Sequence, residues 1–223
     1  MSKLFRTLSI LALIFISVFT NLFNYNKNIV NILIILTTCI FCFFKGKDAY
    51  DDKSIRNKYI ILYLIWNMSY LTFNNSFKDI NNIIDTILLK RVYLDILPTL
   101  AISYIILSIS KNKNIYKYIF ILLLITLFII FKNYIYLYSA IFIIGNLCTF
   151  KLKKINSKVL NLLDYTNIGI YILHKILLYI LLTTKIISYG SISDLFGTII
   201  FIYVIGFIIC YYLKLWPIIR NII

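Results

Sequence analysis

The sequence predicts an all-α fold, a polytopic transmembrane helix bundle of about eight spans with both termini in the cytoplasm. Apolar residues make up 61% of the 223 residues, against roughly 45–50% in soluble domains. They gather in runs of about 14 to 22 residues, close to the roughly 20 that a helix needs to cross a bilayer. Only helices and closed barrels satisfy their backbone in lipid, and the alternating pattern of a barrel strand is absent.

The predicted spans follow from these runs in chain order. They are residues 7–23, 29–44, 59–73, 93–109, 118–131, 134–150, 165–184 and 195–213. The first resembles a signal peptide, but no small-x-small cleavage site follows, so we expect a retained helix. The hinge at Lys132 and Asn133 is weak, and a single re-entrant pair there is the alternative. We predict one transmembrane domain, 1–223.

The segments between the runs decide the orientation. Sixteen basic residues fall on the side of the N-terminus and six on the other, which puts both termini in the cytoplasm by the positive-inside rule. The longest outer segment contains "SFKDINNIIDTILLKR". Its apolar residues have helical spacing and predict an amphipathic helix on the outer surface. These residues are Ile80, Ile83, Ile84 and Leu88.

The net charge of +15 does not indicate a nucleic-acid partner, because the basic residues lie where membrane topology puts them. The predicted partner is the lipid bilayer. Cys39 and Cys42 have a redox or metal spacing, but no second pair or nearby histidine joins them. We therefore read the four cysteines as small apolar residues and predict no metal site.

A polar row lies in the seventh span. Asn167, Tyr171 and His174 are spaced four and three apart, so they share one helical face, which should point into the bundle. His174 is the one histidine of the chain. It serves either to hold neighbouring helices together by hydrogen bonding or as a general base.

The first span has a comparable row, and a basic segment precedes the third. The row is Arg6, Ser9, Leu13, Ser17, Thr20 and Asn24. Ser17 follows Arg6 by about 16 Å on the same face, and helix packing alone accounts for such a row. The basic segment holds Lys53, Arg56 and Lys58, which suit a phosphate or simply mark the cytoplasmic side.

Taken together, these features resemble the bacterial integral-membrane acyltransferases called the acyltransferase 3 family. "NIGIYILH" is similar to the family's S-x-x-I-Y-L-L-H segment, and "KLWPIIRNII" to its basic P-x-x-R tail. "KSIRNKYIILYLIW" is similar to the family's K/R-x-x-R segment before an aromatic helix. The first span resembles the family's opening helix, in which an arginine precedes a catalytic histidine by eleven positions.

The resemblance implies transfer of an acyl group, often acetyl, from acyl-CoA to a sugar hydroxyl. The acceptor would be a cell-surface glycan or lipid-linked sugar, and the protein a multi-pass component of a bacterial plasma membrane. No cofactor would be permanently bound. The implied catalytic residues are His174 and Tyr171. The implied acyl-CoA-binding residues are Lys53, Arg56, Lys58 and Arg6.

The chain departs from the family in ways that leave other functions open. Serine occupies position 17, where the family has its catalytic histidine, and "TTCIFCFF" replaces an expected F-F-x-x-S-G signature. The family usually has about ten spans. His174 is the remaining imidazole, at a depth similar to Ser17. The alternatives are a non-catalytic scaffold or assembly partner in surface-polysaccharide production, and an unrelated transporter-like bundle. The scarcity of glycine and proline speaks against the transporter.

Overall fold

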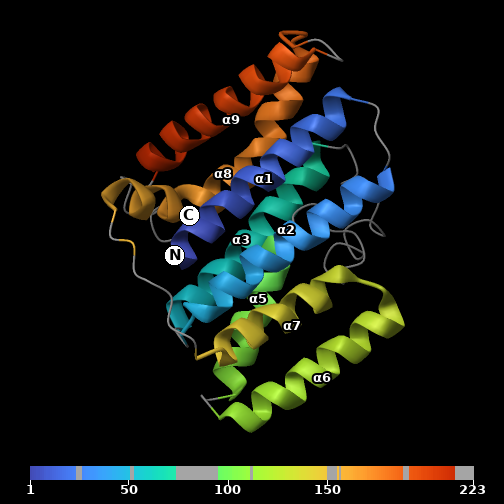
Figure 1. Cartoon of the computed structure of the whole chain (residues 1–223), viewed down its shortest axis with the longest axis vertical. Coiled ribbons are helices and arrows are strands. Elements are labelled where there is room, and N and C mark those ends of the chain that lie inside the picture. The colour runs from blue at the N-terminus through green and yellow to red at the C-terminus, as the bar shows by residue number, and fades with distance from the viewer. Residues whose placement is uncertain are drawn as a thin grey trace. The chain divides into compact units, whose positions relative to one another are not determined.

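The computed structural model describes residues 1–23, 27–50, 53–73, 95–110, 113–149, 155, 157–187 and 191–213. Within these residues the chain forms helices and no strand (Figure 1). The helices are α1 (Ser2–Leu22), α2 (Lys27–Lys47), α3 (Lys53–Phe73), α5 (Ile96–Ser110), α6 (Asn114–Phe131), α7 (Tyr134–Leu147), α8 (Lys158–Thr183) and α9 (Ile192–Leu213).

Each predicted span coincides with one of these helices. Among the described residues, α1, α2, α6, α8 and α9 are long and apolar enough to cross a membrane. The apolar helices α5 and α7 have 15 and 14 residues, about 22 and 21 Å, which is less than the roughly 30 Å hydrocarbon core. The all-α class is confirmed for the described residues, and several helices suit a membrane. The number of crossings and the side of the termini stay predictions.

Two of the predicted features fall outside the described residues. These are the amphipathic helix around Ile80 to Leu88 and the basic tail with Pro217 and Arg220. The chain divides into two compact units. Unit 1 comprises Met1–Phe41 and Lys151–Asn221, and unit 2 comprises Cys42–Phe150, so that the boundary falls within α2. The prediction of a single domain, 1–223, is neither confirmed nor contradicted by this division.

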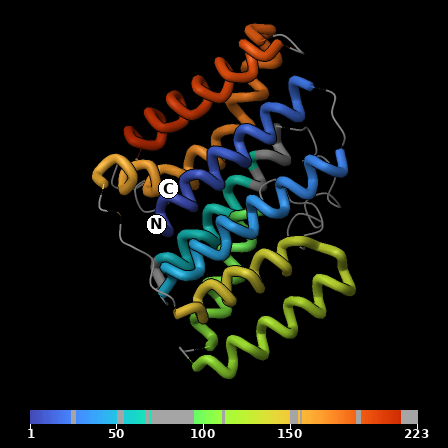
Figure 2. The backbone as a smooth tube through the Cα atoms, in the orientation of Figure 1, coloured from blue at the N-terminus to red at the C-terminus, as the bar shows by residue number. Residues whose placement is uncertain are grey.

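Unit 1 is built around α1, α8 and α9. Hydrogen bonds join Lys3 to Asn161 and Thr7 to Asn167, so residue numbers rise together along α1 and α8 and the two helices run parallel. In contrast, α8 and α9 form an antiparallel hairpin (Figure 2). These directions are those expected of a first, a seventh and an eighth span in an alternating bundle.

Unit 2 contains α3, α5, α6 and α7. The turn between α6 and α7 is set by two residues. Lys132 adopts the left-handed conformation with φ 51° and ends α6, and the Asn133 side chain accepts a hydrogen bond from the Ile135 N–H to begin α7. On α6 only Lys117 and Leu124 are buried. Its remaining surface is rich in exposed Ile, Leu, Tyr and Phe, which suits lipid rather than water.

The C-terminal end of α2 meets α7 through two glycines. A Cβ atom on Gly46 would clash with the backbone carbonyl of Phe142, and one on Gly145 would clash with the carbonyl of Phe43. Glycine at both positions therefore lets the two backbones touch directly, as small residues do between membrane helices. Neither glycine stands out from its sequence context.

Candidate functional site

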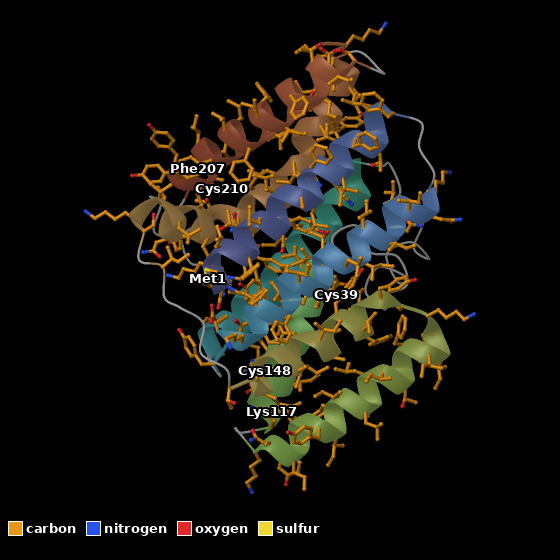
Figure 3. All side chains as sticks on the ribbon, in the orientation of Figure 1. Met1, Cys39, Lys117, Cys148, Phe207 and Cys210 are labelled. Carbon is orange, nitrogen blue, oxygen red and sulfur yellow. The ribbon has the colours of Figure 1, made fainter. Side chains whose placement is uncertain are left out.

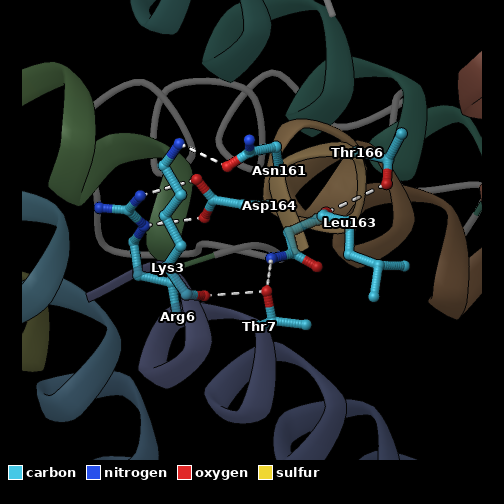
Figure 4. A network of polar contacts seen from close by, with 8 residues as sticks. Lys3, Arg6, Thr7, Asn161, Leu163, Asp164 and Thr166 are labelled. Atoms are coloured by element: carbon cyan, nitrogen blue, oxygen red, sulfur yellow. Dashed lines mark hydrogen bonds and ion pairs between the residues drawn. The ribbon is translucent and has the colours of Figure 1, made fainter. Parts of the chain in front are cut away.

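An ion pair joins the first turns of α1 to α8 (Figure 4). Arg6 Nε lies 2.8 Å from Asp164 Oδ1, and Arg6 Nη2 lies 2.7 Å from Asp164 Oδ2. The side chains are only 6% and 18% exposed. Beside them, Lys3 Nζ donates to Asn161 Oδ1 over 2.8 Å at the surface. Such a two-pronged arginine–carboxylate pair fixes the register of the two helices.

Asn167 links α8 to both α1 and α9. Its Nδ2 donates to Thr7 Oγ1 over 2.9 Å, and its Oδ1 accepts from the Tyr203 hydroxyl over 3.3 Å. Thr7 Oγ1 in turn donates to the Lys3 carbonyl over 2.9 Å. The polar row predicted on this helix thus begins with a residue that is 1% exposed and hydrogen-bonded through both its amide nitrogen and its amide oxygen, as a buried amide requires.

His174 lies two turns further along the same face of α8 and is 2% exposed. Its Nδ1 hydrogen-bonds the backbone carbonyl of Tyr171, and the two rings are 5.2 Å apart between centroids. A carbonyl oxygen can only accept, so Nδ1 carries the proton. In the neutral ring Nε2 then carries the lone pair. The bundle therefore holds a buried imidazole with a fixed tautomer whose basic nitrogen is Nε2.

The polar row on α1 is buried only in part. Arg6, Ser9 and Leu13 are buried, Ser17 is half-buried and Thr20 is exposed. The row is thus buried only as far as Leu13, beyond which the buried face continues through the larger apolar residues Ile14, Val18 and Leu22. Its last member, Asn24, lies outside the described residues. Burial selects the face of greatest apolar area rather than the small polar residues.

Ser17 nevertheless lies at about the depth of His174. In the parallel pair, Lys3 is opposite Asn161 and Thr7 is opposite Asn167. The same offset puts His174 level with residues 14 to 16 of α1. Ser17 is one to three residues beyond, which is at most about 4.5 Å along the helix. This agrees with the predicted similar depth.

Basic side chains gather in unit 2 where α2 ends and α3 begins. Arg56 Nη1 donates to Ser108 Oγ of α5 over 2.6 Å. Lys45 Nζ lies 5.9 Å from the centre of the Tyr59 ring. Burial, and then the charge of Lys45, lower the pKa of Lys58 to about 8. The positive charges are thus close enough to repel each other, which favours an anion beside them.

The remaining predicted residue of this segment, Lys53, begins α3, but its side chain lies outside the described part of the structure. Arg6, also predicted to bind acyl-CoA, is in unit 1 and is held by Asp164. A phosphate bound by Arg6 would have to compete with that carboxylate. The two groups of predicted acyl-CoA ligands therefore belong to different units.

Lys117, at the start of α6, is buried, although its sequence position groups it only with the basic residues between the predicted spans. Lys117 Nζ donates to Asn146 Oδ1 over 2.8 Å, and Asn146 Nδ2 donates to the carbonyls of Gly46 and Ala49 at 3.2 and 2.8 Å. Figure 3 labels Lys117 and Cys148 at the same end of the α6–α7 hairpin. The amide satisfies two carbonyls at and just beyond the C-terminal end of α2, and the ammonium group binds a side chain in the last turn of α7, where the helix dipole is negative.

Sequence reasoning also missed Asp164, although a lone acid at the start of an apolar run was a usable signal. None of the four cysteines is in a disulfide, and no group of three metal-ligating side chains occurs within the described ranges. Comparisons with protein-family models, with curated proteins and with solved structures find no match. The resemblance to the acyltransferase 3 family stays a prediction.

Proposed function

We propose that the chain is a membrane-embedded acyltransferase of the acyltransferase 3 type, which moves an acyl group, often acetyl, from acyl-CoA to a glycan hydroxyl. The observation that carries the proposal is the buried His174, whose Nδ1–H is held by the Tyr171 carbonyl. This bond leaves Nε2 as the basic nitrogen. A general base fixed in one tautomer within a dry helix bundle is the group that such a transfer needs.

The proposed chemistry uses His174 as base and then as acid. Nε2 takes the proton of the acceptor hydroxyl as its oxygen attacks the thioester carbonyl. The new C–O bond forms, the C–S bond breaks, and the departing CoA thiolate is neutralised by the proton that His174 received. Tyr171 supports this role by fixing the imidazole through its backbone carbonyl, since a held ring keeps its lone pair in one direction.

The basic end of unit 2 supports the donor side of the proposal. Lys45, Arg56 and Lys58 lie at the ends of α2 and α3, in segments that the positive-inside rule assigns to the cytoplasm. The phosphates of acyl-CoA carry the charge that such a cluster favours. The proposal includes a location in a bacterial plasma membrane, with no permanently bound cofactor.

One set of observations favours a second candidate, a non-catalytic scaffold. Arg6 is paired with Asp164, and Asn167 is engaged by Thr7 and Tyr203. Polar groups that satisfy one another in this way hold helices together without any chemistry. With serine at position 17, this candidate would be an assembly partner in surface-polysaccharide production.

Purified protein in detergent, given radiolabelled acetyl-CoA and a panel of glycans, tests the proposal. Wild-type protein should release CoA above a heat-killed control, and His174→Gln should abolish release while the protein still folds. Glutamine keeps a hydrogen-bonding amide but cannot cycle a proton near neutral pH. Lys175→Gln, at the exposed neighbouring position, is the matched control and should stay active. Activity that survives His174→Gln would point to another base, and a wild type that releases no CoA above the control would favour the scaffold.

A further inference from the structure

Thr198 on α9 has a buried hydroxyl that differs from those around it. The residue is 2% exposed, and its Oγ1 has no hydrogen-bond partner in the described part of the chain. By contrast, Thr7, Ser9 and Thr166 each donate to the backbone carbonyl four residues earlier. That local bond is the usual way for a helical hydroxyl to be satisfied, and a buried hydroxyl without it is costly.

The contacts between α8 and α9 put Thr198 at the level of His174. Asn167 meets Tyr203 through a hydrogen bond, and a Cβ on Gly206 would lie 3.3 Å from Ile170 Cγ2. The helices are antiparallel, so residue numbers rise along α8 as they fall along α9. His174 is seven residues after Asn167 on α8, and the position seven residues before Tyr203 on α9 is 196. Four residues forward from Ile170 likewise corresponds to position 202. His174 is therefore level with residues 196 to 202 of α9, and Thr198 is among them.

Both side chains also belong to the rows that are buried between these helices. On α8, His174 continues the row of Asn167 and Ile170, which contact α9. On α9, Thr198 continues the row of Ile202 and Gly206, spaced four apart and all buried. A shared level and shared buried rows bring the imidazole and the hydroxyl to one region of unit 1.

We propose that His174 Nε2 and Thr198 Oγ1 together form a binding position for one hydroxyl oxygen between α8 and α9. The lone pair of Nε2 accepts the proton of the bound hydroxyl, and the Thr198 O–H donates to its oxygen. A hydroxyl group both donates and accepts, whereas a carbonyl cannot donate to Nε2 and an ammonium group would bring an unpaired charge into the bundle. The oxygen belongs to the acceptor alcohol or to a water molecule.

The identity of that alcohol as the acyl acceptor rests on the proposed function, but the site does not. Thr198 would then be a positioning residue that holds the hydroxyl while His174 removes its proton. The sequence does not indicate this role for Thr198, because a threonine in an apolar helix usually donates to a backbone carbonyl of its own helix.

A single histidine makes the site directly observable. The protein, labelled with ¹⁵N-histidine and placed in lipid nanodiscs, gives one pair of ring signals because the chain has one histidine. Methanol is the probe. In wild-type protein the Nε2 signal should shift saturably as methanol is added. In Thr198→Val the apparent affinity for methanol should fall by about tenfold, the value of one lost hydrogen bond.

Two further variants separate the outcomes. Thr198→Ser keeps the hydroxyl and should respond like the wild type, which guards against a folding defect in the valine variant. Thr166→Val is the matched control, because that buried hydroxyl bonds the carbonyls of Leu162 and Leu163 and lies two turns from His174. If methanol does not shift the wild-type Nε2 signal, but Thr198→Val shifts that signal in the absence of methanol, a water molecule occupies the position. This result would also support the site.

The inference is overturned if Thr198→Val leaves the Nε2 signal and its methanol response the same as in Thr166→Val. Its failure is distinct from that of the proposed function. An inactive wild type with a Thr198-dependent Nε2 signal would remove the acyltransferase proposal and keep the hydroxyl site. An active wild type whose Nε2 signal does not depend on Thr198 would keep the acyltransferase proposal and remove the hydroxyl site.

Discussion

Replacing Asp164 with asparagine should destabilise unit 1 substantially, because Arg6 would keep its charge and lose its counter-ion. The pair is bidentate, with N–O distances of 2.8 and 2.7 Å, and its side chains are 6% and 18% exposed. At an effective dielectric constant of 20, unit charges 3 to 4 Å apart attract by about 4 to 5.5 kcal/mol. Residual hydration of Asp164, and the hydrogen bond that the amide of the new asparagine can still accept, offset part of this attraction. We therefore expect the free energy of unfolding to fall by about 2 to 3 kcal/mol.

The control is the neighbouring pair between the same two helices. Lys3 and Asn161 form one hydrogen bond at the surface, so Asn161→Ala should cost only about 0 to 1 kcal/mol. Replacing both Arg6 and Asp164 by leucine should recover most of the loss, because a buried pair exchanged for apolar side chains is often neutral.

Reversible unfolding in mixed micelles, followed by circular dichroism as the fraction of denaturing detergent rises, gives these differences. The double-mutant comparison isolates the pair from other effects of each substitution. If Asp164→Asn were no less stable than Asn161→Ala, the ion pair would not hold α1 to α8. Arg6 would then be available to phosphate, as the sequence resemblance predicted.

Three further predictions concern the glycine contact between α2 and α7, the pKa of Lys58 and the membrane topology. Gly46→Ala should destabilise the protein by several kcal/mol in the same assay, since its Cβ meets backbone, whereas Gly197→Ala, in open space, should stabilise it by roughly 0.5–1 kcal/mol. Equal effects would refute the direct backbone contact. Folding lowers the pKa of Lys58 from 10.5 to about 8, so the unfolded chain binds more protons between these values and wild-type stability should rise from about pH 8 to pH 10.5. In Lys58→Met that rise should become smaller in the unfolding curves, with a remainder from Lys117, whose pKa burial also lowers, and an unchanged slope would contradict the burial of the Lys58 ammonium group. Reporter fusions after Lys58, Lys117 and Lys158 should read as cytoplasmic and one after Lys78 as external, and the opposite pattern would refute the eight-span topology.

The candidate site was predictable as a set of residues on one helix but not as a set of partners. Spacing alone put Asn167, Tyr171 and His174 on one face of α8, and the structure buries all three. The same reasoning extended the row on α1 to Ser17 and Thr20, where the buried face had already turned to larger apolar residues. A polar residue in a span must be satisfied somewhere, but its sequence position does not say by which helix.

The sequence by itself determined the helical class, the approximate ends of the helices and the grouping of basic residues between them. These depend on local quantities, since transfer of a segment into lipid and the satisfaction of its own backbone are decided residue by residue. Only the tertiary structure decided that Arg6 belongs to Asp164, and that α1 and α8 lie parallel. It likewise brought Thr198 to the level of His174. Between helices embedded in lipid the hydrophobic effect contributes little to association. Close packing and hydrogen bonds between residues far apart in the chain therefore determine which helices pair.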